Sequence, residues 1–303
     1  MWLFFTLITT LLWGIAELFY KKGSHEDCKY DHLRVCVLVG AVMGIHAIFT
    51  LLTSDITYDP MNLIAYLPVS LCYIISMACS FFGIRFIEES LADPIENTSG
   101  AMCSIMCVLF LGDKISLPVW IAIAVIVVGI IGVTQTEKSA EVNRSQKLGK
   151  KLATVAFLMP FCYAFIDALG CVLDIFFLEM ETSPLIGITE ENIELVANIS
   201  YELTFAIVGL ALFIFMKINK VKFELPKQGD KAIAAVCETA GQLTYVYAMS
   251  GNGAIAAPIL SSVCVVSLLL SRIFLKEKLT KKQYLFIGII IVGILLLAVL
   301  EGE

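Results

Sequence analysis

Charged residues are scarce in this chain. Of its 303 residues, 16% are charged and 59% are hydrophobic, and the mean hydropathy is +0.88. A water-soluble domain needs a polar surface and does not contain apolar runs as long and as numerous as those in this sequence. The composition therefore excludes a soluble globular protein and indicates a protein that crosses a membrane several times.

Sequence patterns of enzymes and metal sites are also absent. The chain has no GxxxxGKS/T, GxGxxG, HExxH or GxSxG pattern, so nothing in it points to an ATPase, a dehydrogenase or a hydrolase. There is no CxxC pair, and nine of the ten cysteines fall within apolar runs, so neither a disulfide framework nor a zinc site is expected. We expect no enzymatic activity, no catalytic residue, no metal and no cofactor.

Ten apolar runs have roughly the 20-residue length that a helix needs to cross a bilayer. These runs are apolar throughout, whereas the strands of a membrane barrel alternate, so helices are favoured. The fold class that we predict is an all-α membrane protein with ten transmembrane helices. The predicted spans are residues 2–21, 32–53, 61–86, 91–111, 117–135, 151–178, 194–216, 231–250, 253–275 and 282–300.

Proline and glycine mark special points within these spans. Pro68, Pro160 and Pro258 lie inside predicted helices, where each is expected to interrupt the helix and free backbone carbonyl groups. Gly40 and Gly44 are four residues apart in the second span. This spacing predicts close packing of that helix against a neighbour.

One part of the sequence recurs 164 residues later. Residues 91–95 (LADPI) return as 255–259 (IAAPI), and residues 112–115 (GDKI) return as 276–279 (KEKL). The same offset pairs Gly129 with Gly293, so the repeat covers roughly forty residues of each half. A duplicated membrane unit is typical of transporters, in which two repeats move about a shared site in the middle of the membrane.

The basic residues lie almost entirely on one side of the predicted helices. Loops and helix ends on that side hold 20 of the 21 Lys and Arg residues, and only Lys114 lies on the other side. Because basic loops stay in the cytoplasm, we predict that both termini lie outside the cell. Five helices per repeat would make the repeats inverted. We therefore predict a plasma-membrane protein with a first repeat at 1–136, a cytoplasmic linker at 137–149 and a second repeat at 150–303.

Acidic residues remain inside several predicted helices, although a charge at the centre of a membrane helix costs about 2.5–3.5 kcal/mol. Helical spacing places these acids on shared faces with aromatic and amide side chains. We expect them to line a central cavity in which Glu238 is the main site for a cation or a proton. The candidate substrate-binding residues are Trp13 and Glu17 on the first helix, Tyr163 and Asp167 on the sixth, and Glu238, Gln242 and Tyr245 on the eighth.

Other polar residues have simpler explanations. Glu17 lies one turn before Lys21 and could form an ion pair there. Asp174 is near the outer end of the sixth helix and is expected to be solvated. His46 is expected to be a hydrogen-bonded packing residue, and Glu202 could face a neighbouring helix.

Lysine and arginine are absent from the middle of every predicted helix. A pocket for phosphates or sugar nucleotides needs fixed positive charge, so a cationic, zwitterionic or neutral substrate is favoured. Aromatic side chains beside carboxylates form the usual cage for organic cations. The aromatic candidates are Trp13, Tyr73, Tyr163, Tyr245 and Tyr247.

Three features occur in order along the chain. Trp13 and Gly14 lie in the first helix with Lys21 at its end, the chain has two five-helix repeats, and a charged step precedes the last helix of each repeat at 112–118 and 276–280. Together they resemble the drug/metabolite transporter superfamily and, within it, the EamA-type transporters. The resemblance covers nearly the whole chain. It implies secondary transport of small metabolites, amino acids, amines or drugs, commonly as export.

Two functions are compatible with these observations. The first is secondary active transport by alternating access, coupled to protons, that exports a small organic cation, an amino acid or a related metabolite. Its partners would be the substrate, protons and the lipid bilayer, with no nucleic acid. The second is a non-transporting membrane scaffold or receptor built on the same duplicated fold. The embedded acids favour the transporter, because a scaffold has no reason to tolerate the cost of inserting them.

Overall fold

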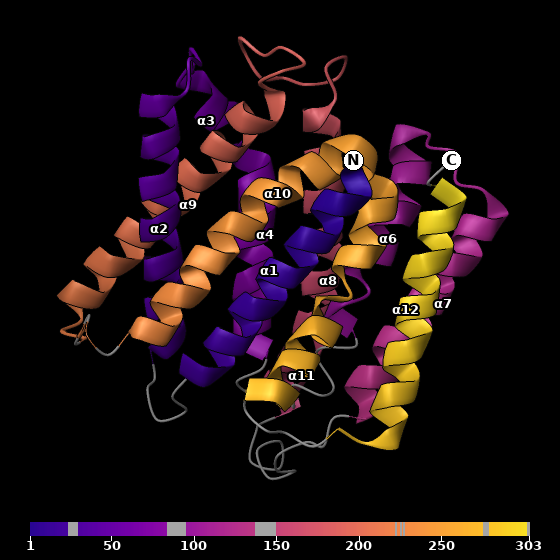
Figure 1. Ribbon diagram of the computed structural model, residues 1–303. Helices are drawn as coiled ribbons and strands as arrows, with labels where there is room; N and C mark the ends of the chain where they lie inside the picture. Colours follow the sequence, from indigo (N-terminus) through magenta and orange to yellow (C-terminus); the bar gives the residue numbers. More distant parts are fainter. Residues whose placement is uncertain are drawn as a thin grey trace.

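The computed structural model describes residues 1–23, 30–83, 95–136, 150–221, 223–224, 226, 228–274 and 279–301. Within these residues the chain forms helices joined by turns and loops, without a strand. Figure 1 shows the helices packed as a bundle whose two chain ends lie in the same half. The prediction of an all-α protein is confirmed for this part of the chain. The predicted linker at 137–149 and Pro94 lie outside the described residues.

The apolar runs form helices because a backbone in hydrocarbon must satisfy its own hydrogen bonds. Among the described residues, five helices are long and apolar enough to cross a membrane, or six if α10 and α11, bent by 53°, count as one span. The membrane-protein class is thus confirmed, while the number of ten spans stays a prediction. The five are α1 (Trp2–Gly23), α2 (Asp31–Thr53), α8 (Lys150–Leu178), α9 (Ile193–Ile218) and α12 (Lys281–Glu301), and the bent pair is α10 (Gly229–Leu260) with α11 (Val263–Phe274). The shorter apolar helices are α4 (Leu67–Gly83), α6 (Ser99–Met106) with the π-helix η1 (Cys107–Leu111), and α7 (Leu117–Thr136).

The three prolines differ in their effect on the helices. The short helix α3 (Met61–Ala65) and α4 are separated at Tyr66, close to Pro68. α8 runs unbroken through Pro160, so the expected interruption there is wrong. A proline removes only one backbone hydrogen bond, and neighbouring helices can hold the rest of the helix in place. α10 contains Pro258 and has a non-helical residue at Asn252 (φ −167°, ψ 68°), between the predicted spans 231–250 and 253–275.

The carbonyl group freed by a proline finds a partner in another helix. Pro258 has no N–H to bond to the carbonyl of Ala254, four residues earlier. The hydroxyl of Ser104 on α6 donates a hydrogen bond to this carbonyl over 2.5 Å. The expectation that Pro258 frees a carbonyl group at depth is therefore confirmed, and the freed group joins α6 to α10.

Two turns lie at equivalent positions of the sequence repeat. They occupy residues 97–98, before α6, and residues 261–262, between α10 and α11. The difference 261 − 97 is 164, the offset of the repeat. The two interruptions are in contact, since the backbone N–H of Gly100 donates a hydrogen bond to Oγ of Ser261 over 3.2 Å.

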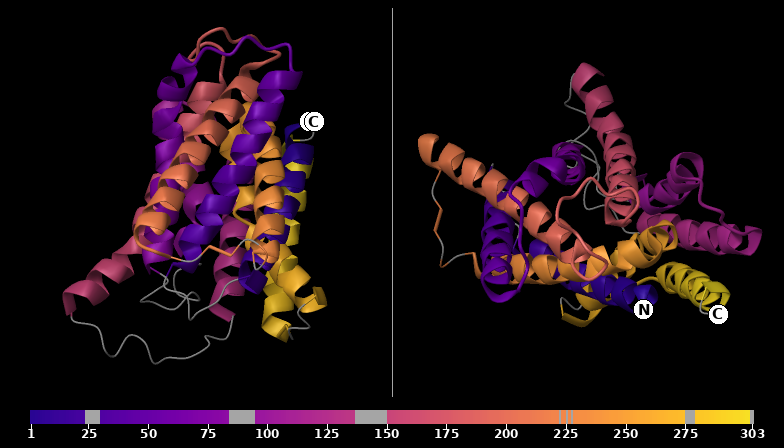
Figure 2. Two further views of the ribbon diagram at one scale, coloured as in Figure 1. Left: turned by 90° about the vertical axis from the view of Figure 1, so that its left-hand side faces the viewer. Right: turned by 90° about the horizontal axis from the view of Figure 1, so that it is seen from above.

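The helices pair in a pattern that relates the two halves of the chain. α1 packs along α10 and α11, and α8 packs along α4 and α6. α2 packs with α9, and α7 packs with α12. Figure 2 shows the α7–α12 pair on one side of the bundle and α2 with α9 on the other. The contact of α1 with α10 in this pattern corresponds to the contact of α8 with α4. The contact of α1 with α11 corresponds in the same way to that of α8 with α6.

The contact between α7 and α12 is reciprocal. A side chain at Gly129 would collide with Ile290, and one at Gly293 would collide with Ile126. Each glycine is 164 residues from the other, and so is each isoleucine. Both isoleucines are fully buried. Reciprocal contacts of this kind arise when two equivalent elements are related by a two-fold axis.

Small residues bring α2 and α9 together. A side chain at Gly40 would collide with the backbone carbonyl of Phe205, and one at Gly44 would lie 2.8 Å from the β-carbon of Ala206. The Cα of Gly209 is also 3.0 Å from the point where a Gly40 side chain would begin. The packing contact predicted from Gly40 and Gly44 is confirmed.

Candidate functional site

Aromatic side chains from four helices meet inside the bundle. The rings of Trp13 on α1 and Tyr245 on α10 have centroids 5.2 Å apart and planes inclined by 30°. Tyr73 of α4 packs edge-on against Tyr245 at 6.2 Å and against Tyr201 of α9 at 5.8 Å. These four residues, here called the aromatic group, join two predicted site residues, Trp13 and Tyr245, to two tyrosines of other helices.

The position of Trp13 depends on a glycine in α10. A side chain at Gly241 would collide with the indole ring of Trp13. The indole Nε1 donates a hydrogen bond to the backbone carbonyl of Glu238 over 3.4 Å. One turn before Trp13, the hydroxyl groups of Thr9 and Thr244 are 2.7 Å apart. The close approach of α1 and α10 thus places the indole ring next to the turn of α10 that carries Glu238.

The predicted acidic residues surround the aromatic group. Glu17 of α1 and Glu238 of α10 are within electrostatic range of each other. Tyr163 of α8 is within range of both Asp167 and Glu17. Tyr201 of the aromatic group is within range of Glu238 and Asp167. The predicted residues of α1, α8 and α10 therefore lie in one region of the bundle.

Gln242, the remaining predicted residue, is buried with 3% of its surface exposed. Its amide nitrogen Nε2 has no hydrogen-bond partner among the described residues. A buried donor without a partner costs about 1–3 kcal/mol. The amide of Gln242 is therefore a group that a ligand or a water molecule would stabilise.

The carboxylates of Asp167 and Glu238 differ in their surroundings. Ser76 and Ser99 lie near the Asp167 carboxylate, and the Ser76 hydroxyl donates its hydrogen bond to the backbone carbonyl of Tyr73 over 2.9 Å. Ser99 is the first residue of α6, so Asp167 also faces a helix N-terminus, where a negative charge is favoured. Within the described part of the chain no donor bonds to the Glu238 carboxylate, and its neighbour Glu17 is also an acid. Asp167 therefore has serine hydroxyl groups and a helix N-terminus nearby, whereas the acid Glu17 is the charged neighbour of Glu238.

Asp174 of α8 is buried, with 1% of its surface exposed, so the expectation of a solvated residue is wrong. The hydroxyl of Tyr66 donates a hydrogen bond to Oδ1, and Oδ2 has no partner in the described chain. The loop after α8 folds back over this end of the helix. There Asn62 of α3 exchanges two hydrogen bonds with the backbone of Ile186, at 3.0 and 2.7 Å.

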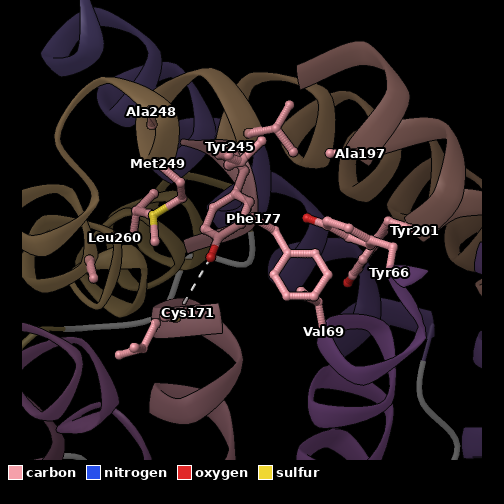
Figure 3. Close-up of a cluster of buried hydrophobic side chains, with 14 of the residues drawn as sticks. Tyr66, Val69, Cys171, Phe177, Ala197, Tyr201, Tyr245, Ala248, Met249 and Leu260 are labelled. Carbon is pink, nitrogen blue, oxygen red and sulfur yellow. Dashed lines mark hydrogen bonds between the residues drawn. The ribbon is translucent and has the colours of Figure 1, made fainter. Parts of the chain in front are cut away.

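Sequence reasoning missed some residues of this region. Figure 3 shows Tyr66, Tyr201 and Tyr245 in the same buried cluster, with the Tyr245 hydroxyl directed at Sγ of Cys171, 3.6 Å away. Tyr66 lies in the turn between α3 and α4, where no helical periodicity marks it, and Tyr201 is missed although it shares a face of α9 with Glu194 and Asn198. Tyr247, one of the aromatic candidates, stacks on Phe5 at 5.2 Å, outside the aromatic group.

The buried lysine of α10, Lys231, binds the carboxyl end of α1. Lys231 is 1% exposed, and its ammonium group donates a hydrogen bond to the backbone carbonyl of Gly23 over 2.7 Å. A positive charge is favoured at this carboxyl end of α1. Lys231 lies seven residues before Glu238, roughly 10 Å along the helix axis. Among the described residues, no three His, Cys, Asp or Glu side chains are arranged to hold a metal ion.

These helices and the embedded polar cluster define a polytopic helical membrane protein. The model of the EamA-like transporter family matches residues 1–135 and 182–299. The chain therefore belongs to the EamA-like transporter family, as its resemblance to the drug/metabolite transporters predicts. This family assignment agrees with a membrane transporter of small molecules.

Solved structures share the fold. One, described as "Crystal structure of protein", matches with a TM-score of 0.72 and 13% sequence identity, over 99% of this chain and 96% of that chain. At this identity the likeness concerns the fold alone. No curated protein matches the sequence.

Proposed function

We propose that this protein is a secondary active transporter that exports a small organic cation, an amino acid or a related metabolite in exchange for protons. Membership of the EamA-like family supports a transporter of the drug/metabolite type. One observation carries the finer proposal. The carboxylate of Glu238 has no hydrogen-bond donor among the described residues, and its helix turn lies beside the indole ring of Trp13.

The charge of the site favours an amine as the substrate. Aromatic faces attract cations, most strongly where water is excluded, and the aromatic group offers the rings of Trp13, Tyr73, Tyr201 and Tyr245. The nearby acids supply negative charge, and the ammonium group of Lys231 is bonded to the end of α1. An ammonium group bound beside Glu238 would therefore find both a counter-charge and aromatic walls.

Competition for Glu238 would couple the substrate to protons. The carboxylate of Glu238 has no hydrogen-bond donor among the described residues, and a charge without a partner in a medium of low dielectric constant is unfavourable. Either a proton or the ammonium group of a substrate would neutralise this charge. Because both would use the same carboxylate, a proton taken up from outside would displace the substrate there. The carboxylate would then lose the proton on the cytoplasmic side and bind the next substrate.

The scaffold for this cycle would be ten spans in two inverted repeats, at 1–136 and 150–303, joined by a cytoplasmic linker at 137–149. The reciprocal contact of Gly129 and Gly293 and the two turns 164 residues apart support this arrangement. Inverted repeats allow alternating access, since each repeat can adopt the conformation of the other. The residue 164 positions before Glu238 is Ile74, so the site would be asymmetric on a symmetric scaffold.

The site proper would be a central cavity between the two repeats. Its lining would be the seven candidates predicted from the sequence, together with Tyr73 and Tyr201. We add Tyr73 because its ring contacts Tyr245, and Tyr201 because its ring contacts Tyr73. Placement in the plasma membrane with both termini outside rests on the distribution of Lys and Arg.

The test is proton flux driven by a substrate in proteoliposomes. A thermal-shift screen of amines, amino acids and related metabolites identifies the substrate, because a ligand of the native state raises its stability. We expect Glu238→Gln to lower both substrate affinity and proton flux by about tenfold or more, equivalent to roughly 1.4 kcal/mol. Glu190→Gln, an exposed carboxylate in the loop before α9, is the matched control and should transport normally.

Two outcomes would contradict the proposal. Flux and affinity that survive Glu238→Gln unchanged would make Glu238 a packing residue. Ligand binding without any flux in the wild type would favour the alternative, a scaffold or receptor built on this fold.

A further inference from the structure

His46 and Glu202 form a buried pair outside the aromatic group. Nδ1 of His46 on α2 lies 2.8 Å from both Oε1 and Oε2 of Glu202 on α9. The Glu202 side chain is fully buried, and the His46 side chain is 29% exposed. Both residues lie well inside helices that are long and apolar enough to cross a membrane, Leu33–Thr53 and Ile193–Ile218.

Few ionisable groups face this pair. The groups that act on Glu202 are His46 and the amide of Asn198. Tyr201, next to Glu202 in the chain, is within range of Glu202 and also of Glu238 on α10. Glu238 is not among the groups that act on Glu202 in the described structure. His46 and Asn198 are therefore the groups that act most directly on Glu202, and Tyr201 lies between Glu202 and Glu238.

The remaining neighbours are uncharged phenols. From the loop before α3, Tyr58 forms a hydrogen bond of 2.9 Å with Ser200 of α9. Burial raises the pKa of Tyr58, so this phenol stays neutral. α3 contains no ionisable residue, and Tyr73 of α4 contacts Tyr201. Carboxylates lie beyond these phenols, with Asp59 in range of Tyr58 and Asp174 in range of Tyr201, whereas His46 and Glu202 contact each other directly.

A row of polar side chains runs from the pair toward the beginning of α9. Glu194, Asn198 and Glu202 are spaced four residues apart and share a helix face. Glu194, in the first turn, accepts a hydrogen bond of 2.9 Å from Ser250. Asn198 is fully buried, yet neither its amide nitrogen nor its oxygen has an aligned partner among the described residues. A buried amide of this kind is a place for water, which would link Glu194 to Glu202.

We propose that His46 and Glu202 form a proton-binding site, separate from the transport site and connected to the aqueous phase along Glu194 and Asn198. An imidazolium beside an ionised carboxylate is neutral as a pair, which makes it less costly in the membrane than either charge alone. If this neutral pair gains a proton its net charge becomes +1, and if it loses a proton its net charge becomes −1. Because Gly40 and Gly44 hold α2 directly against α9, the protonation state acts on the packing of these two helices.

Nuclear magnetic resonance of histidine labelled with nitrogen-15 tests this site without any substrate. The chain has three histidines, His25, His32 and His46, so His46→Gln assigns the ring of interest. At neutral pH we expect the His46 ring of the wild type to be protonated on both nitrogens and to lose one proton in a single step as the pH rises. In Glu202→Gln the ring should be neutral at the same pH, because the imidazolium has lost its counter-charge.

Two controls separate this site from the transport site. Glu190→Gln and Glu238→Gln should both leave the His46 signal unchanged, even if Glu238→Gln abolishes transport. A neutral His46 ring in the wild type at every pH at which the protein is folded would overturn the proposal. So would a doubly protonated ring that persists in Glu202→Gln.

A second measurement covers the case in which Glu202→Gln does not fold. In His46→Gln the infrared spectrum should show a protonated carboxylic acid that the wild type lacks, because Glu202 no longer has a cation beside it. An ionised Glu202 in both proteins would count against the proton site.

Discussion

The hydroxyl groups of Tyr73 and Tyr245 lie 2.5 Å apart and form a hydrogen bond between α4 and α10. Under the proposed duplication these two helices are equivalent, so the bond joins the repeats within the aromatic group. Tyr245 also packs its ring on Trp13 at 5.2 Å. One residue therefore contributes both a link between the repeats and a face of the proposed cation site.

Substitutions of Tyr245 should separate these two roles. Tyr245→Phe removes the hydroxyl and keeps the ring, so the free energy of unfolding should fall by about 0.5–1.5 kcal/mol with little change in affinity for an amine substrate. Tyr245→Leu also removes the ring and should weaken amine binding by roughly 0.5–2 kcal/mol more. Calorimetric titration measures the affinities. Equal affinities of the two variants would show that the ring is not part of the site.

Glycine substitutions test the packing of α2 on α9. A side chain at Gly40 would collide with the Phe205 carbonyl, so Gly40→Ala should destabilise the protein by about 1–3 kcal/mol. Gly288→Ala in α12 is the control, since no atom lies within 4 Å of its added carbon. Alanine favours the helix there, so we expect no loss of stability. Chemical unfolding in detergent compares the two, and equal stability would contradict the close contact.

Labelling of introduced cysteines tests the predicted orientation. The prediction rests on the 20 of 21 Lys and Arg residues that lie on one side of the predicted spans. In a variant without the ten native cysteines, a thiol reagent that cannot cross the membrane should label positions in the 181–191 loop and not those in the 138–150 segment of intact cells. Labelling of the 138–150 segment from outside would reverse the topology.

Local periodicity predicted much of the candidate site. The spacing of Glu238, Gln242 and Tyr245 placed them on one face of α10, and the structure turns that face toward α1 and Trp13. The boundary predicted between residues 250 and 253 coincides with the non-helical backbone of Asn252. These features depend on a few neighbouring residues, so the sequence of a single helix contains the information.

Other features could not be predicted from one helix at a time. Asp174 lies near the end of α8, and only the fold shows that it is buried and bonded to Tyr66. Tyr66, in the turn before α4, bonds to Asp174 of α8, and Tyr201 of α9 packs on Tyr73 of α4, contacts between distant segments that no local sequence marks.

The sequence alone determined that this protein lies in a membrane, that its spans are helical and that a stretch of roughly forty residues recurs at an offset of 164. Hydropathy and the need to satisfy backbone hydrogen bonds in hydrocarbon are enough for those conclusions. The tertiary structure decided which groups lie beside each embedded acid. Asp167 meets Ser76 and Ser99, and Glu202 meets His46, 156 residues away. Periodicity gives the face on which a side chain lies, whereas the groups opposite that face come from distant segments that only folding brings together.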